Sequence, residues 1–146
     1  MSALARLAEL GIALPEVAAP AGAYVPAVRT GNLVYTAGQV ARGLSGKVGA
    51  EISEADAKDA ARTCALNALA AIDALVGLDS VVRVVKVVGF VASAAGFTGQ
   101  PGVINGASGL LGEVFGAAGE HARSAVGVAQ LPLGAPVEVE LIVEVS

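Results

Sequence analysis

The clearest pattern of apolar and polar positions lies at the end of the chain. Every second residue from 137 to 145 is aliphatic, and most of the residues between them are glutamates. Because side chains alternate between the two faces of a strand, this pattern predicts a strand with one face in the core and one acidic face. The aliphatic positions are Val137, Val139, Leu141, Val143 and Val145, and the acidic positions are Glu138, Glu140 and Glu144.

Other segments are also typical of strands. Residues 24–28 and 33–37 are rich in β-forming residues, and Thr30-Gly31-Asn32 lies between them, which predicts a hairpin. Residues 81–91 are dense in valine and predict a central strand. A further strand is expected from about residue 122 to residue 129.

Two longer helices are predicted between these strands. Ser53-Glu-Ala-Asp56 resembles a capping box, and Gly77 supplies a helix end. Residues 103–115 also have helical spacing, although three glycines weaken it. Apolar residues recur between Ser53 and Gly77 at steps of three and four, at Ala57, Ala61, Cys64, Ala65, Ala68, Ile72 and Leu75.

The N-terminus carries a shorter helical pattern. Leu4, Leu7 and Leu10 have helical spacing before Gly11, and a connector rich in proline and alanine follows through Pro20. We interpret residues 1 to about 20 as an extension that contributes only packing. The element order ββ-α-β-α-ββ predicts an α+β fold in which two helices cover one face of a sheet, and residues 1–146 are expected to form one domain.

Composition adds a prediction about assembly. Hydrophobic residues make up 55% of the chain, and with its 19 glycines the apolar share is about two thirds. That share exceeds the usual 45–50% or so. No run of about 18 uncharged apolar residues exists that could span a membrane. We therefore expect the surplus to be buried between subunits.

The charged residues and the cysteine narrow the possible functions and the expected location of the protein. A net charge of −4 and 3% aromatic residues disfavour nucleic-acid binding. Arg6 and Glu9 interrupt the one apolar segment that could act as a signal peptide. A single cysteine, Cys64, cannot form an internal disulfide, which favours a cytoplasmic location.

Several kinds of active site lack their residues. His121 is the only histidine, so a zinc site built from histidines and cysteines is not expected. Ser124 is three residues away on the same predicted strand, where its side chain would point to the opposite face from that of His121, so a catalytic triad is disfavoured. The segment from Gly43 to Lys47 lacks the phosphate-loop pattern. We expect no metal and no cofactor.

Arg123 is the most informative charged residue, since it begins a strand otherwise made of small and apolar residues. A guanidinium in such a place needs an anion, and a small carboxylate would suit it. An ordinary ion pair with a glutamate, or a solvated strand end, is the alternative. If residues 132–136 joined the last two strands as a hairpin, Arg123 and Glu138 would lie roughly 20 Å apart. The two would then meet only across subunits or in another topology.

Two blocks of sequence resemble the signatures of the RidA/YjgF family. The first runs from Tyr24 to Leu33 with Thr36-Ala-Gly-Gln39, and the second runs from Ala122 to Pro132 with Val137-Glu-Val-Glu140. Ile104-Asn105 is similar to the family's helix motif. The resemblance spans about residues 20 to 146. It implies a chorismate mutase-like homotrimer with sites between subunits, and hydrolysis of 2-imino or enamino acids to 2-keto acids without a cofactor.

The resemblance also implies roles for individual residues. Arg123 would bind the substrate carboxylate, and Glu138 would position or activate water. The implied substrate-binding residues are Tyr24, Gly38, Asn105 and Ala125. A non-catalytic trimer that binds small carboxylates and regulates a partner is the alternative function, and ribonuclease activity is a third.

Simpler interpretations of these residues remain open. Tyr24 could be a strand-edge aromatic, Asn105 a helix N-cap and Glu138 one of several solvated glutamates. His121 is expected at a surface or an interface, and Cys64 in the core. The chain also departs from the family pattern at Ala37, Ala125 and Gly127, where serine, cysteine and glutamate are common. These departures indicate a divergent branch, with either a different substrate or binding without catalysis.

Overall fold

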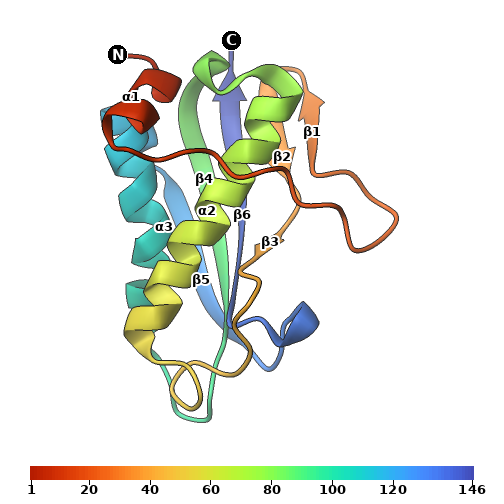
Figure 1. Ribbon diagram of the computed structural model, residues 1–146, viewed down its shortest axis with the longest axis vertical. Coiled ribbons are helices and arrows are strands. Elements are labelled where there is room, and N and C mark those ends of the chain that lie inside the picture. Colours follow the sequence, from red (N-terminus) through yellow and green to blue (C-terminus); the bar gives the residue numbers. More distant parts are fainter.

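The computed structural model describes residues 1–146 as three helices, six strands and three short 3₁₀ turns (Figure 1). The helices are α1 (Ala3–Glu9), α2 (Glu54–Val76) and α3 (Gln100–Phe115). The strands are β1 (Ala27–Thr30), β2 (Leu33–Thr36), β3 (Gln39–Val40), β4 (Val81–Ala92), β5 (Ala122–Val128) and β6 (Val137–Val145). The 3₁₀ turns are η1 (Leu78–Ser80), η2 (Gly116–Gly119) and η3 (Pro132–Gly134).

All six strands belong to one sheet, in the order β1-β2-β6-β4-β5, with β3 also paired to β6. β4 runs parallel to β5 and antiparallel to β6. The hairpin considered for the last two strands is therefore wrong, because β4 lies between them. The 3₁₀ turn η3 and its flanking residues form a crossover instead, and they carry the chain past the end of β4.

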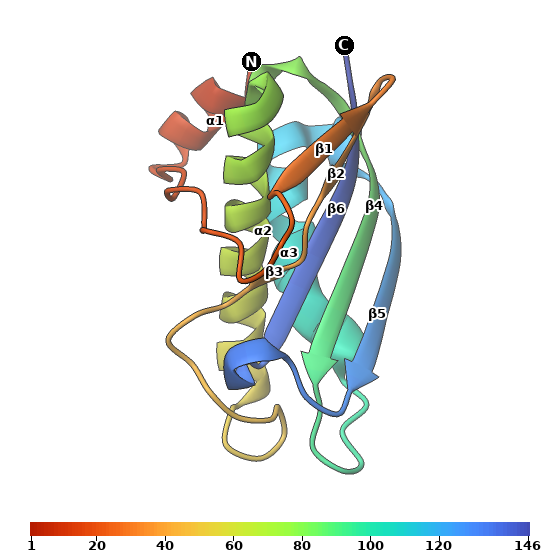
Figure 2. The same ribbon diagram turned by 90° about the vertical axis from the view of Figure 1, so that its right-hand side faces the viewer.

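The helices α2 and α3 pack side by side on one face of this sheet, as predicted (Figure 2). Ser53 caps α2 by accepting a hydrogen bond from the backbone N–H of Asp56 at 3.1 Å. Gly77 ends α2 with a φ of 81°. Gly106 lets the two helices approach closely, because a Cβ there would collide with the carbonyl of Lys58.

The core lies between the helices and the sheet. Along β6 the five aliphatic residues are buried and the residues between them are half-buried, so the predicted alternation is confirmed. The N-terminal hairpin is also confirmed, with Ala27 opposite Thr36. Its first strand begins at Ala27, later than predicted, and Tyr24 lies in the preceding loop. Pro26, which has no N–H to donate, stands at that boundary.

The other face of the sheet carries no helix (Figure 2). Large hydrophobic side chains are exposed there, including Val28, Tyr35, Val85 and Val126. Such a face on a small protein is typical of an interaction surface. None of the helices combines the length and the apolar character that a bilayer span needs.

Cys64 is buried in the core on α2, as predicted, and its Sγ–H donates to the carbonyl of Val137. Burial raises the pKa of Cys64 to about 12. Because the thiolate is the reactive form, we expect no reaction of the native protein with Ellman's reagent at mildly alkaline pH. Unfolding in guanidinium chloride should release one reactive thiol per chain. Rapid labelling of the native protein would contradict this placement of Cys64.

Candidate active site

Glu138 lies near the start of β6, between the buried residues Val137 and Val139. Its side chain therefore points away from the core, and it lies directly against Gly38. A Cβ at position 38 would overlap the Glu138 carboxylate, so a glycine is needed there. Partial burial raises the pKa of Glu138, and the negative charge of Glu140 raises it further. This carboxyl group is consequently not one of several equivalent solvated glutamates.

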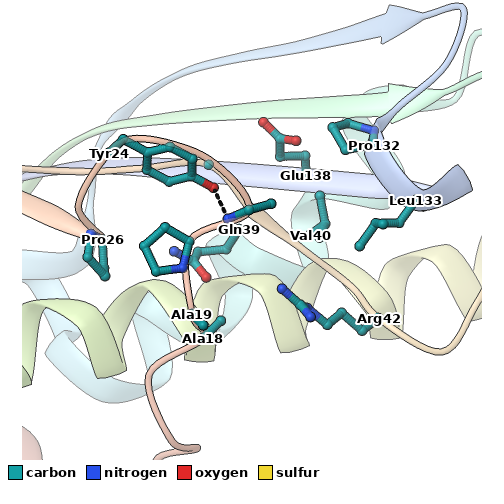
Figure 3. A pocket seen from close by; sticks show the side chains of 13 residues that line it. Ala18, Ala19, Tyr24, Pro26, Gln39, Val40, Arg42, Pro132, Leu133 and Glu138 are labelled. Atoms are coloured by element: carbon teal, nitrogen blue, oxygen red, sulfur yellow. Dashed lines mark hydrogen bonds between the residues drawn. The ribbon is translucent and has the colours of Figure 1, made fainter.

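A cavity of about 90 Å³ adjoins Glu138 (Figure 3). Tyr24 and Gly38 line it, as expected of substrate-binding residues. The Tyr24 hydroxyl accepts a hydrogen bond from the backbone N–H of Ala21 at 3.1 Å, which leaves its own O–H free to donate. Tyr24 is thus part of a cavity and not simply a strand-edge aromatic.

The sequence analysis missed two contributors to this cavity. Residues 18–21 form part of its wall, so the N-terminal extension does more than add packing. The segment crosses α2 on its way from α1 to β1 (Figure 1). Arg42 also lines the cavity, on the side toward α2 (Figure 3), and forms no ion pair. No sequence signal marked either contributor, since their position depends on the path of two loops.

Arg123 lies near the start of β5, and its side chain reaches α3. Its Nη1 donates to Asn105 Oδ1 at 2.8 Å and to Ser108 Oγ at 3.2 Å, and its Nη2 donates to the carbonyl of Pro101 at 3.3 Å. No carboxylate of this chain pairs with it. The alternative of an ion pair within the chain is therefore wrong, whereas the half-buried guanidinium near the start of β5 still contacts solvent.

Asn105 and Ala125 lie close to Arg123. Asn105 is in the second turn of α3, so its interpretation as an N-cap is wrong, and its amide oxygen holds the guanidinium. Ala125 follows Arg123 by two residues on β5 and packs against the core, so the two share one face of the strand. With a methyl group at position 125, this part of the site has no thiol.

His121 has a partner that the sequence analysis did not identify. Its Nε2 lies 2.9 Å from Ser108 Oγ, and its Nδ1 lies 2.6 Å from the carbonyl oxygen of Gly119. The residue is half-buried within the chain. Ser108 follows Asn105 by three residues, so helical spacing places both on one face of α3 and could have indicated this cluster.

The predicted site residues thus form two separate groups in one chain. Arg123 is opposite Val87 on β4, and Val87 is opposite Leu141 on β6, three residues beyond Glu138. These registers place the Cα atoms of Arg123 and Glu138 roughly 14 Å apart. Their side chains also lie on opposite faces of the sheet. The first group is Arg123, Asn105 and Ala125, and the second group is Glu138, Gly38 and Tyr24.

The raised pKa of Glu138 predicts how the stability of the fold changes with pH. A protonated Glu138 stabilises the fold below the ordinary carboxyl value of 4.5, and this contribution is lost as the pH rises through the raised pKa. Glu138→Gln resembles the protonated form at every pH. We expect the Tm of this variant to match the wild-type value in acid and to exceed it at neutral pH.

The comparison uses differential scanning calorimetry of both proteins across this pH range. Glu144→Gln removes a negative charge from the same strand but outside the cavity, and serves as the control. A Tm difference for Glu138→Gln that stays constant from acid to neutral pH would contradict the buried, raised-pKa state of Glu138.

Comparisons with known proteins agree with this fold. The sequence profile of the family named Endoribonuclease L-PSP matches residues 15–145. Protein TCP17 of Trypanosoma cruzi is 46% identical over 97% of this chain and 93% of its own length. The crystal structure of Atu1372 from Agrobacterium tumefaciens is 44% identical with a TM-score of 0.90, covering 99% of this chain and 92% of Atu1372.

A further solved structure, E. coli TdcF with bound serine, is 27% identical with a TM-score of 0.64. It covers 91% of this chain and 94% of TdcF. The match of the family profile to most of the chain agrees with the two sequence signatures and with the sheet topology. The chain belongs to the endoribonuclease L-PSP family, which is also called the RidA/YjgF family.

Proposed function

We propose that this protein hydrolyses 2-imino and enamino acids to 2-keto acids and ammonia, at sites formed between the subunits of a cytoplasmic homotrimer. The observation that carries the proposal is the guanidinium of Arg123, which α3 holds with neutral acceptors and without a carboxylate. Such a guanidinium is suited to bind a small carboxylate with two parallel hydrogen bonds. The serine bound to the related TdcF is a ligand of this chemical class.

Glu138 is the candidate for the proton transfers. The oxygen of water bonds to the carbon of the protonated imine, the C=N electron pair moves to nitrogen, and Glu138 takes a proton from the water. Glu138 then gives this proton to the amino group of the carbinolamine, the C–N bond breaks, and ammonia leaves. Glu138 takes up the hydroxyl proton as the carbonyl forms and releases it to solvent. A carboxyl group with a raised pKa exchanges protons more readily near neutral pH than an ordinary one.

The geometry of one chain supports a site shared between copies. Arg123 and Glu138 lie on opposite faces of the sheet, so one chain cannot present both to a substrate of a few carbon atoms. Glu138 also lines an open depression on the helix-free face, beside Val28 and Tyr35. A second copy packed on this apolar face could bring its Arg123 edge to Glu138.

Two measurements test the proposal. An amino-acid oxidase generates the imine in the presence of semicarbazide, which traps it, and active protein should lower the yield of trapped product. Light scattering during size-exclusion chromatography should give the mass of three chains. A monomer in solution would contradict the shared site, and an unchanged semicarbazide yield would contradict the activity.

The same experiments separate the alternative functions. Binding of 2-ketobutyrate that depends on Arg123, without any effect on trapping, would favour the non-catalytic carboxylate-binding trimer. If an activity that cleaves a defined RNA copurifies with the protein, and if a Glu138 variant lacks it, ribonuclease activity would be favoured.

A further inference from the structure

Three residues on one side of α3 accept hydrogen bonds from the guanidinium of Arg123. Pro101, Asn105 and Ser108 are spaced by four and three residues, so they share one side of the helix. Each offers an oxygen to the guanidinium: a backbone carbonyl, a side-chain amide oxygen and a hydroxyl. The guanidinium is therefore held from one side by three neutral groups.

Counting the donors of Arg123 shows what remains for a ligand. A guanidinium has five N–H groups. The two on Nη1 and one on Nη2 have partners within the chain. The Nε–H and the second Nη2–H have none. Nε has no partner and lies on the Nη2 side of the planar group, so this is the side on which a carboxylate can bind.

His121 determines which way the Ser108 hydroxyl points. The Gly119 carbonyl can only accept, so His121 Nδ1 carries a proton; when this is the only proton on the ring, Nε2 is an acceptor. Ser108 must then donate its O–H to Nε2. This bond leaves the oxygen lone pairs of Ser108 for the Nη1 of Arg123. Without an acceptor at Nε2, the hydroxyl proton could turn toward the guanidinium.

We propose that Ser108 and His121 are positioning residues, which hold the Arg123 guanidinium with its Nε–Nη2 edge turned to the substrate carboxylate. The inference rests on the proposed function, in which Arg123 binds that carboxylate. In this inference the Ser108–His121 pair affects the affinity for the substrate. Proton transfer is assigned to Glu138, which belongs to the other group of site residues.

Calorimetry with 2-ketobutyrate tests this assignment. We expect Ser108→Ala to bind about tenfold more weakly than wild type, because a charged donor loses its acceptor. His121→Leu should weaken binding about three- to fivefold by the loss of the fixed hydroxyl. His121→Gln keeps an acceptor close to the Nε2 position and should restore most of the affinity. In the imine assay, Ser108→Ala should raise KM by the same factor as Kd and leave kcat nearly unchanged.

A neutral analogue separates positioning from a general loss of structure. The amide 2-oxobutanamide lacks the carboxylate, so any binding it shows should be equal for wild type, Ser108→Ala and His121→Leu. Far-UV circular dichroism and Tm identify variants that fail to fold. If one does, Ser108→Thr, which keeps the hydroxyl, provides the second test and should retain wild-type affinity.

The outcomes distinguish this inference from the proposed function. Loss of 2-ketobutyrate binding with Arg123→Ala, but wild-type binding by Ser108→Ala and His121→Leu, overturns only the positioning role. Equal binding by wild type and Arg123→Ala overturns the role of Arg123 in carboxylate binding, and the positioning role with it. A fall in kcat without a change in KM for Ser108→Ala also contradicts the inference.

Discussion

Replacing Arg123 by alanine is expected to lower kcat/KM for imine hydrolysis by about two to four orders of magnitude. Two hydrogen bonds between a guanidinium and a carboxylate are each worth about 1.5–3 kcal/mol, and roughly 1.4 kcal/mol corresponds to a factor of ten. The loss should be visible in the semicarbazide assay and in calorimetry with 2-ketobutyrate. The fold should persist, because the side chain lies at the margin of the sheet and is only half-buried.

Two variants control this result. Arg123→Lys keeps the charge but cannot form the two parallel hydrogen bonds, so it should recover only part of the affinity. Arg62→Ala removes an arginine whose exposed ion pair with Glu113 lies on the helix surface, and it should leave the activity unchanged. Near-normal activity of Arg123→Ala would refute the carboxylate-binding role.

The second large effect concerns a pair of inactive variants. Glu138→Gln should lose about 10²- to 10⁴-fold in kcat, the usual contribution of a general acid–base group. Co-expressed with Arg123→Ala, it should nevertheless recover activity. A site that takes Arg123 from one copy and Glu138 from the next is intact in about a quarter of the interfaces of randomly mixed trimers.

Different affinity tags on the two variants allow the mixed trimers to be purified. Each purified mixed trimer contains two copies of one variant and one of the other, so one of its three sites is intact. The specific activity of these trimers should approach one third of the wild-type value, whereas each variant alone stays inactive. A mixture of the two separately assembled proteins, which share no interfaces, is the control. Absence of recovery in purified mixed trimers would show that the two residues do not act across an interface.

The residues on which these two predictions depend could be recognised in the sequence to different degrees. Arg123 stood out as a charge in a strand of small and apolar residues, whereas the family resemblance distinguished Glu138 from the other glutamates of its strand. Tyr24 and Gly38 followed from the same signatures, and the structure brings both to Glu138. Asn105 was recognised as a site residue, but its alternative as a helix cap was settled only by its place inside α3.

Residues whose importance comes from long-range contacts were missed or misread. Arg42 and residues 18–21 reach the cavity by loop paths that no local pattern specifies. Ser108 and His121 are thirteen residues apart and meet only because β5 runs beside α3. Helical spacing could have linked Ser108 to Asn105, but not to a histidine on another element.

The local elements of this protein follow from residues that are close together in the chain. The alternation along β6, the Ser53 cap and the Gly77 end of α2 each depend on residues close together in the chain, and side-chain period and backbone conformation act over that range. The turn of the first hairpin belongs to the same class, since Gly31 and Asn32 lie directly between its strands.

The pairing of those elements depends instead on contacts between distant parts of the chain. β4 lies between β5 and β6 because of backbone hydrogen bonds between segments far apart in sequence, and such bonds are nearly independent of side-chain identity. This order brings Arg123 to α3 and Glu138 to Gly38, and it sets the distance between the two charges across the sheet. The separation of the site into two parts is thus a property of strand order, which a local pattern of residues does not encode.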